Sequence, residues 1–305
     1  MIQALFQSAK VTSRSRLVTY NNHSIRTMSK TSVPSSLQGA PIKSLVPIGQ
    51  CQFNDEPIQV PLIERTRVSP TSSVLRFGLP DATKPLNLST CACILATADI
   101  GGESVTRPYT PISTNAHVGY FDMLIKDYGE GAKMSRHMHE IAPGDKIAFK
   151  HIKGNVKMQA PFPYKKIAML VGGTGITPFI QALHAMLGET DGSGPVVTVL
   201  YGSRVQEDIL GDALLQEWAK NYPEKFTLVN VLSHEPEDST WKGVRGHPNK
   251  ALIEEHFPKP DEKDIQIFIC GPPPMYNALS GPREDKELGG LLKEMGYSAE
   301  QVYKF

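Results

Sequence analysis

The stretch LVGGTGITPF, residues 170–179, decides how the second half of this 305-residue chain folds. Three glycines and two threonines follow an apolar run, and a proline stands where a helix would begin. Thr177 is predicted to cap that helix and Pro178 to occupy its first position. The glycines let backbone N–H groups approach an anion at the helix N-terminus, which carries partial positive charge. A purely structural turn is the alternative, and the missing Gly-Lys-Ser/Thr disfavours a nucleoside triphosphatase loop.

The residues after this stretch alternate between short apolar runs and amphipathic segments. Strands are predicted at 165–171, 196–203, 226–233 and 265–270, and helices at 178–187, 208–222, 249–257 and 287–296. This alternation predicts a parallel sheet with helices on its faces. Ligands of such sheets bind at the carboxyl ends of the strands, which is where the glycine-rich stretch falls.

The preceding part of the chain has a different spacing of apolar runs. Strand-like runs punctuated by Pro and Gly are predicted at 58–68, 73–79, 91–100, 107–113, 120–128 and 145–151. Their close spacing predicts an antiparallel barrel or sandwich. One helix, at 134–141, is expected to interrupt it, with Ser135 as its cap.

Two further segments carry groups that suit a phosphate-bearing ligand. RPYTPIS (107–113) supplies a guanidinium that can take a phosphate bidentately and a tyrosine that can lie against a planar ring. Strand alternation predicts Arg107 and Tyr109 on one face and Thr110 on the other, although an exposed edge strand would read the same way. GEGAKMS (129–135) again places small residues before a helix. Glycine-rich segments that can hold a phosphate thus occur in both predicted domains. Together with RPYTPIS, they predict two phosphate-bearing cofactors that meet at a domain interface.

The chain resembles a known family in four motifs that occur in the same order. RPYTPIS, GAKMS, GGTGITPFIQ and CGPPPMY resemble the NADH–cytochrome b5 reductase family of ferredoxin reductase-type flavoproteins, over about residues 55–305. HFPKP and the ending GYSAEQVYKF resemble its mitochondrial, plant-like branch. The resemblance implies a β barrel that binds FAD (51–162) followed by an α/β domain with a parallel sheet that binds the nicotinamide nucleotide (163–305).

The activity that the resemblance implies uses FAD and NADH. NADH would deliver a hydride to the flavin, which passes single electrons to a haem acceptor, with cytochrome b5 as the expected partner. A flavin reductase of the same fold that serves an iron–sulfur protein or a quinone is the alternative. A nucleotide-binding regulator without turnover is a second one.

The resemblance also implies site residues. Arg107 would bind an FAD phosphate, Pro108 and Tyr109 would line the flavin, and Thr110 would hydrogen-bond near its N5. Other implied FAD contacts are Leu124, Ile125, Lys126, Lys133, Met134 and Ser135. Implied nicotinamide-nucleotide contacts are Gly172, Gly173, Thr174, Gly175, Thr177, Pro178, Asp208, Cys270, Gly271, Pro272 and Met275. Thr110 and Cys270 are the residues expected beside the hydride path.

Two choices stay open, and one motif departs from the family pattern. Asp208 suits the free ribose hydroxyls of NADH, as in the family, whereas Arg204 suits the extra phosphate of NADPH. Phe305 is either an aromatic cover for the flavin, as in some distant flavin reductases, or a structural terminus. The family's Gly-Gly-Lys-Met-Ser-Gln reads differently here, since Ala132 and Arg136 replace its second Gly and its Gln.

Charge is distributed unevenly along the chain, whose net charge is +1. No acidic residue precedes Asp55, although Lys and Arg recur there among many Ser and Thr. This composition is typical of an organellar transit peptide, followed by a linker within residues 1–50, and a disordered basic arm is the alternative. With the resemblance to the mitochondrial branch, a mitochondrial transit peptide is expected. The small net charge gives no reason to expect nucleic-acid binding. No apolar run approaches the roughly 20 residues that span a bilayer, which leaves only peripheral membrane contact, and the four cysteines lack a metal-binding spacing.

Overall fold

The computed structural model describes residues 33–43, 51–129, 131–154, 162–189 and 194–305. The predicted transit peptide lies outside these ranges. The described residues belong to one compact unit that begins at Ser32. None of its described helices combines the length and the apolar composition that crossing a membrane requires.

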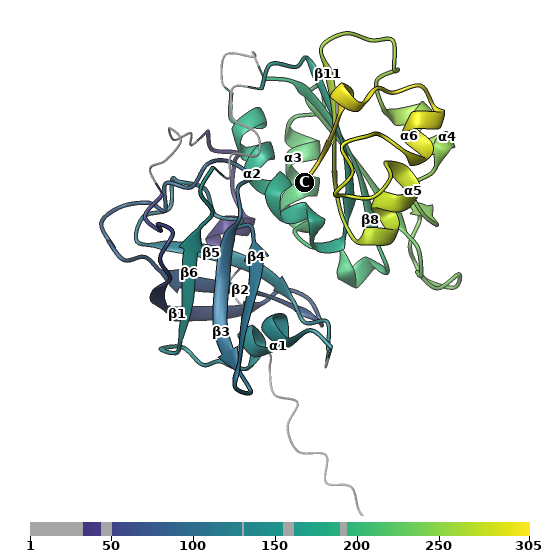
Figure 1. Ribbon diagram of the computed structural model, residues 1–305. Helices are drawn as coiled ribbons and strands as arrows, with labels where there is room; N and C mark the ends of the chain where they lie inside the picture. Colours follow the sequence, from purple (N-terminus) through teal and green to yellow (C-terminus); the bar gives the residue numbers. More distant parts are fainter. Residues whose placement is uncertain (1–32, 44–50, 130, 155–161, 190–193) are drawn as a thin grey trace, which may run out of the picture. The chain divides into compact units, whose positions relative to one another are not determined.

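The first sheet is antiparallel and curled, and α1 lies at its end strands (Figure 1). Its strands, in the order β4-β3-β6-β1-β2-β5, are β4 (Glu103–Tyr109), β3 (Ile94–Ile100), β6 (Lys146–His151), β1 (Ile58–Arg67), β2 (Ser72–Gly78) and β5 (Tyr120–Lys126). The first residues of β1, 58–61, pair with β6, whereas residues from Leu62 onward pair with β2, with an irregularity between Leu62 and Glu64. Such a break bends the strand. The predicted barrel is therefore confirmed as a curled half-barrel.

Helix α1 (Lys133–Glu140) confirms the predicted helical insert, but its cap differs from the prediction. Ala132 is the N-cap residue, and the Ser135 hydroxyl donates to the Ala132 carbonyl at 3.2 Å. Ser135 already lies inside the first turn, so its oxygen cannot cap the free N–H groups ahead of it. Met134 and Met138 enter the core of the curled sheet, beside the rings of Phe77 and Phe149, whose centroids are 5.0 Å apart.

The second sheet is parallel throughout, as predicted. Its order is β10 (Val244–Arg245), β9 (Phe226–Leu232), β8 (Val196–Ser203), β7 (Lys166–Gly172), β11 (Ile265–Cys270) and β12 (Val302–Lys304). Its helices are α2 (Ile176–Leu187), α3 (Asp212–Asn221), α4 (Lys250–His256), α5 (Pro273–Leu279) and α6 (Gly290–Glu294). The short strands β10 and β12 and helix α5 are additions that the alternating pattern did not reveal.

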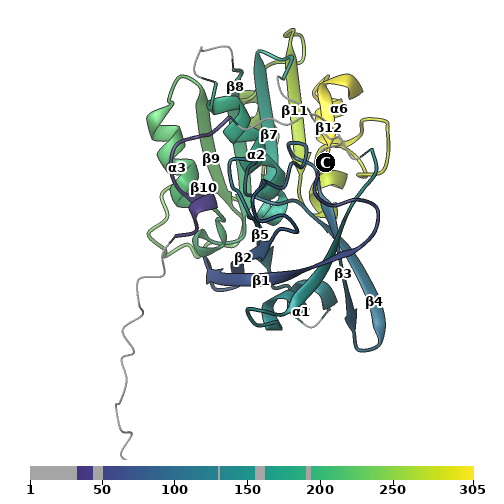
Figure 2. The same cartoon turned by 90° about the vertical axis from the view of Figure 1, so that its left-hand side faces the viewer.

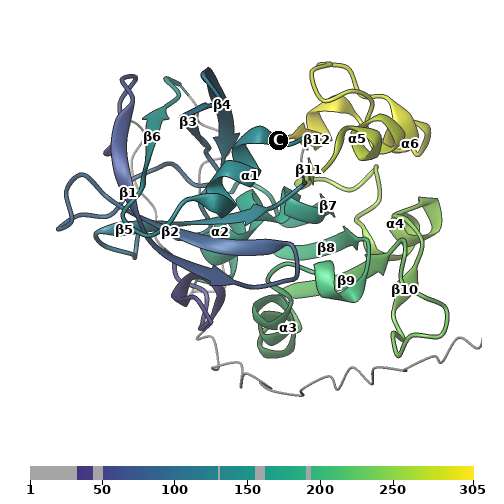
Figure 3. The same cartoon turned by 90° about the horizontal axis from the view of Figure 1, so that it is seen from below.

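Both faces of the parallel sheet are covered, because successive side chains of a strand point to opposite sides. Ile167 and Met169 of β7 join a core with α2 and α3, whereas Ala168 and Leu170 join a core with α4, α5 and α6. The two groups of helices lie on opposite sides of the strands (Figure 3). The first core also takes in Leu124 of β5, so the curled sheet and the α/β part share apolar contacts.

The order of the parallel strands reverses at β7, which lies between β8 and β11 (Figure 2). Val171 at the end of β7 is in register with Cys270 at the end of β11. This is the switch point at which ligands of open α/β sheets bind. A 3-10 turn, Gly173–Gly175, then leads into α2. The predicted cap is wrong, because the helix begins before Thr177, whose hydroxyl instead donates to the Thr174 carbonyl at 3.1 Å.

Candidate functional site

A cavity of about 720 Å³ lies between the curled sheet and the carboxyl ends of the parallel strands. Its volume is within the range of small-molecule sites, roughly 300–1,000 Å³. The predicted site residues along its wall are Pro108, Tyr109, Thr110, Leu124, Ile125, Lys126, Gly172, Gly173, Thr174, Gly175, Thr177, Pro178, Asp208, Cys270, Gly271 and Pro272. The fold thus brings most of the implied FAD and nicotinamide-nucleotide contacts to one place.

The three glycines of the opening stretch have different physical roles. A Cβ on Gly175 would lie 2.1 Å from the Cys270 carbonyl oxygen, and one on Gly172 would lie 2.7 Å from the Met275 sulfur. These two glycines let the ends of β7 and β11 approach each other. Gly173 has φ +52 and open space where its Cβ would be, so its backbone faces the cavity without a side chain. The stretch is therefore both a tight packing device and an exposed backbone surface.

Hydroxyl groups hold this glycine loop from two sides. Tyr201 is fully buried, and its hydroxyl donates to the Gly173 carbonyl at 3.1 Å while accepting from the Leu210 N–H at 3.2 Å. Burial raises the pKa of the Tyr201 phenol well above its ordinary value, so it stays a donor. From the curled sheet, the Tyr128 hydroxyl lies 2.8 Å from that of Thr174. The loop is fixed in place before any ligand binds.

The RPYT segment is fixed by a glutamine of α2. Gln181 is 7% exposed, donates to the carbonyls of Pro111 and Ser113 at 2.8 and 3.0 Å, and accepts from the Cys91 N–H at 3.0 Å. Tyr109 is half-buried; burial raises its pKa to about 12, although the nearby Arg107 opposes that rise. The amide of Gln181 thus ties the segment that carries Thr110 to the α/β domain.

Lys126 and Asp208 come from opposite walls and form an ion pair. Their Nζ and Oδ1 atoms are 3.0 Å apart, and the side chains are 19% and 17% exposed. The Thr71 hydroxyl lies 3.5 Å from the same carboxylate oxygen. The resemblance assigns Lys126 to FAD and Asp208 to the nicotinamide nucleotide. The pair therefore joins the two predicted subsites.

Five predicted contacts lie off the cavity wall: Arg107, Lys133, Met134, Ser135 and Met275. Arg107 is exposed on the edge strand β4, and its Nη1 donates to the Thr106 carbonyl at 2.8 Å. Lys133 is paired with Glu103, and the side chain of Met134 is buried in the core. The roles of the first four in holding FAD, and that of Met275 beside the nicotinamide, stay predictions.

The C-terminal residue is held firmly. The Phe305 N–H donates to the Ile269 carbonyl at 3.0 Å, and its own carbonyl accepts from the Tyr276 hydroxyl at 2.7 Å. Its ring is 5% exposed, packs edge-on against Phe179 and Phe268, and lines the cavity beside Cys270. Phe305 is thus both a structural terminus and part of the wall.

The cavity contains residues that sequence reasoning missed. They include Cys91, Cys93, Tyr128, Ser203, Ser233, His234, His247 and Arg283. Ser203 and Ser233 are the last residues of the predicted strands 196–203 and 226–233, so listing the residue at the carboxyl end of each predicted strand would have found them. Tyr128 and Arg283 carry no such local signal.

The cavity suits FAD and a nicotinamide nucleotide. It offers open glycine backbone, as at Gly173, that a pyrophosphate can approach closely. It also holds the cations Lys126, Arg204 and Arg283 and, at Tyr109, an aromatic wall. A curled antiparallel sheet and a parallel α/β sheet that share such a site define a two-domain flavin- and nicotinamide-dependent oxidoreductase.

Comparison with known proteins agrees with this class. Residues 59–158 match the oxidoreductase FAD-binding domain, and residues 169–280 match the oxidoreductase NAD-binding domain. NADH-cytochrome b5 reductase 2 of Neurospora crassa is 39% identical over 254 residues, which cover 81% of this chain and 73% of that protein. Its counterpart in Pyricularia oryzae is 38% identical over 237 residues, covering 76% of this chain and 70% of that protein. The chain belongs to the NADH–cytochrome b5 reductase family.

A solved structure shows the same fold. The cytochrome b5 reductase domain of Ulva prolifera nitrate reductase superposes with a TM-score of 0.72 at 24% identity. The match covers 84% of this chain and all of that domain.

Proposed function

We propose that this protein oxidises NADH through bound FAD and passes single electrons to a haem protein, cytochrome b5. The observation that supports it most directly is the single cavity in which the RPYT segment, the glycine loop and the CGPP segment meet. Bound FAD supplies the chemistry, because it takes up a hydride and can release electrons one at a time.

The chain's own residues contribute placement and exclusion of water. Gly173 and its neighbours offer backbone N–H groups to a pyrophosphate, and Tyr128 and Tyr201 keep that loop in position. Gln181 keeps Thr110 at the cavity wall, where its hydroxyl can hydrogen-bond a flavin nitrogen. Phe305 and Cys270 close the side beside the switch point. No general acid or base is needed for hydride transfer, so the rate depends on how the nicotinamide and the flavin are oriented toward each other.

The test is anaerobic mixing. The purified chain should be yellow, NADH should bleach it, and ferric cytochrome b5 should restore the colour as it is reduced. A ferredoxin and a quinone serve as competing acceptors, and faster oxidation by either would replace cytochrome b5 as the partner. A preparation without flavin, or one that NADH leaves unbleached, would refute the proposal.

We further infer that the protein is imported into mitochondria. The support is the acid-free, basic and hydroxyl-rich composition that precedes Asp55.

A further inference from the structure

A short N-terminal segment, residues 34–43, contacts both domains; we call it the clasp. It starts with a 3-10 turn, Ser35–Leu37, in which the Leu37 N–H donates to the Pro34 carbonyl at 2.8 Å. The prolines around it predicted a linker. The structure instead buries Ser36 and Leu37.

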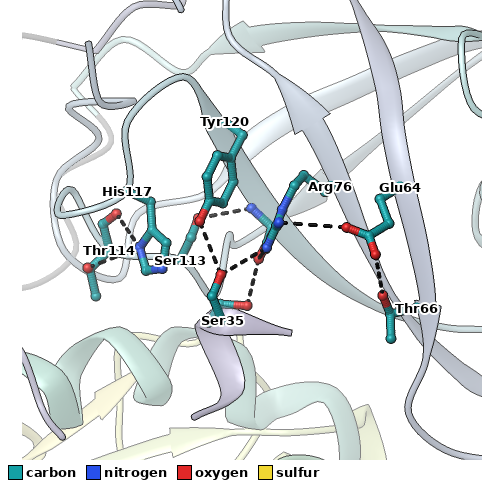
Figure 4. Close-up of polar contacts among 10 residues, drawn as sticks. Ser35, Glu64, Thr66, Arg76, Ser113, Thr114, His117 and Tyr120 are labelled. Atoms are coloured by element: carbon teal, nitrogen blue, oxygen red, sulfur yellow. Dashed lines mark hydrogen bonds and ion pairs between the residues drawn. The ribbon is translucent and has the colours of Figure 1, made fainter. Parts of the chain in front are cut away.

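The first half of the clasp binds the curled sheet. Ser36 donates to Asp122 on β5 at 2.8 Å, and Asp122 is fully buried and paired with Arg76 on β2. Arg76 also donates to the Ser35 hydroxyl at 3.0 Å and lies over the Tyr120 ring (Figure 4). A buried carboxylate that has a guanidinium and a hydroxyl as partners makes strong, charge-assisted hydrogen bonds.

The second half binds the α/β domain. Trp218 on α3 donates from its indole to the Gly39 carbonyl at 2.9 Å, and the Ile42 N–H donates to Nδ1 of His184 on α2 at 3.0 Å. Lys43 pairs with Glu189 at 2.6 Å. Gly188 allows the clasp to approach this closely, because a Cβ at position 188 would lie only 2.5 Å from the Lys43 backbone nitrogen.

The middle of the clasp fills the junction between the two. Leu37 is 6% exposed and belongs to the core that also contains Val74 and Leu124 of the curled sheet and Ile180 of α2. Leu37 therefore adds apolar contact to both sides at once. None of residues 34–43 lines the cavity, so the clasp can act on a bound cofactor only through the two domains.

We propose that the clasp is a positioning element that sets the α/β domain against the FAD-binding sheet for hydride transfer. The effect of the clasp on the rate of hydride transfer rests on the proposed function, whereas its binding to the two domains does not. Hydride transfer requires reacting atoms about 3–3.5 Å apart, and a displacement of about 1 Å can cost 10²-fold in rate. A segment held by a buried hydrogen bond to the curled sheet and by partly buried ones to the α/β domain limits such displacement.

The experiment uses the full chain in a Trp241→Phe background. The chain has two tryptophans, so Trp218 then becomes the sole tryptophan, and its fluorescence, excited selectively, reports on the clasp. Ser36→Ala removes the bond to Asp122. Gly39→Ala strains the clasp itself, because Gly39 has φ +88 with nothing within 4 Å of an added Cβ. Gly144→Ala is the matched control, since Gly144 has φ +99, the same open space and no contact with the clasp.

Two quantities are measured in each variant: quenching of Trp218 by acrylamide and the rate of anaerobic flavin reduction at saturating NADH. Both clasp variants should increase quenching and slow reduction by about tenfold, within the range that small displacements produce. Their FAD content should equal that of the parent, and Gly144→Ala should change neither quantity.

Increased quenching with reduction at the parental rate would overturn the proposal, because the clasp would then be only a cover. Unchanged quenching in both clasp variants would also overturn it, as would equal slowing in Gly144→Ala. If the parent itself fails to oxidise NADH, the proposed function and the positioning role fail together, while quenching still reports whether the clasp is docked.

Discussion

Lys126 on β5 and Asp208 beyond β8 form an ion pair across the cavity, with 3.0 Å between Nζ and Oδ1. The pair changes the argument about cofactor choice, because the carboxylate that should repel the 2′-phosphate of NADPH already has a cation beside it. Arg204 lies on the same wall and is exposed. We therefore expect the preference for NADH to depend on Asp208 keeping Lys126 from acting on a phosphate.

We expect the wild-type protein to prefer NADH by at least about a hundredfold, which corresponds to about 2.7 kcal/mol. Asp208→Thr should raise kcat/KM for NADPH, because it removes the repulsion and leaves Lys126 without its carboxylate. FAD content should barely change. Steady-state kinetics with both nucleotides check this.

The double variant Asp208→Thr/Lys126→Ala separates the two causes. If the freed lysine matters, the gain with NADPH should shrink in the double variant. A wild type that uses both nucleotides equally would show instead that Arg204 dominates.

Thr110→Val should retain FAD but slow flavin reduction by about tenfold, because it removes about one hydrogen bond's worth of free energy from the transition state. Thr110 lines the cavity, and the resemblance places its hydroxyl near the flavin N5. Stopped-flow reduction at saturating NADH measures the effect. Thr106→Val is the control, since Thr106 bonds to Thr97 at 2.8 Å away from the wall. Equal rates for Thr110→Val and wild type would place the Thr110 hydroxyl elsewhere.

Arg107→Ala should weaken FAD binding by one to two decades, because a charge-assisted bond to phosphate contributes about 1.5–3 kcal/mol. The exposed side chain of Arg107 would have to leave the Thr106 carbonyl to make that bond. Arg67→Ala is a matched control, since Arg67 is also exposed and bonded to nearby backbone carbonyls. FAD titration of the apoprotein measures both. Unchanged affinity in Arg107→Ala would remove Arg107 from the site.

Sequence reasoning succeeded where a function depends on local spacing. Gly173 lies at the cavity wall, as its position at the carboxyl end of a predicted strand indicated, because strand ends and glycine turns are local features.

Contacts between distant segments could not be predicted. Gln181 reaches Pro111 and Ser113 over a separation of about seventy residues, and Ser36 reaches Asp122 over 86. The position of Arg107 shows the opposite limit. Strand alternation predicted on which face of the strand Arg107 lies. Its exposure, however, arises because β4 is an edge strand, and the order of strands in a sheet is a property of the tertiary structure.

The localisation inference has a direct test. Residues 1–31 fused to a fluorescent reporter should enter mitochondria, because a basic, acid-free composition suits import. A diffuse cytosolic signal would refute it.

If the clasp is needed in the mature enzyme, N-terminal sequencing of the imported full chain should show that cleavage occurs before Val33. Cleavage beyond Lys43 would contradict that need.

The last prediction concerns pH and His184, whose Nδ1 accepts the Ile42 N–H of the clasp. Burial lowers the pKa of His184 to about 4, and the nearby His117 adds to the effect. The unfolded chain, with a His pKa near 6.5, therefore binds the proton more readily than the folded chain does. The stabilisation is complete above about pH 6.5 and is lost as the pH falls towards 4. Between pH 7 and pH 5 the loss should be about 2 kcal/mol, measured by urea unfolding at each pH. His184→Asn, which keeps an acceptor for the Ile42 N–H but does not titrate, should flatten this dependence. Equal pH slopes for wild type and His184→Asn would show that His184 does not control the acid sensitivity of the folded protein.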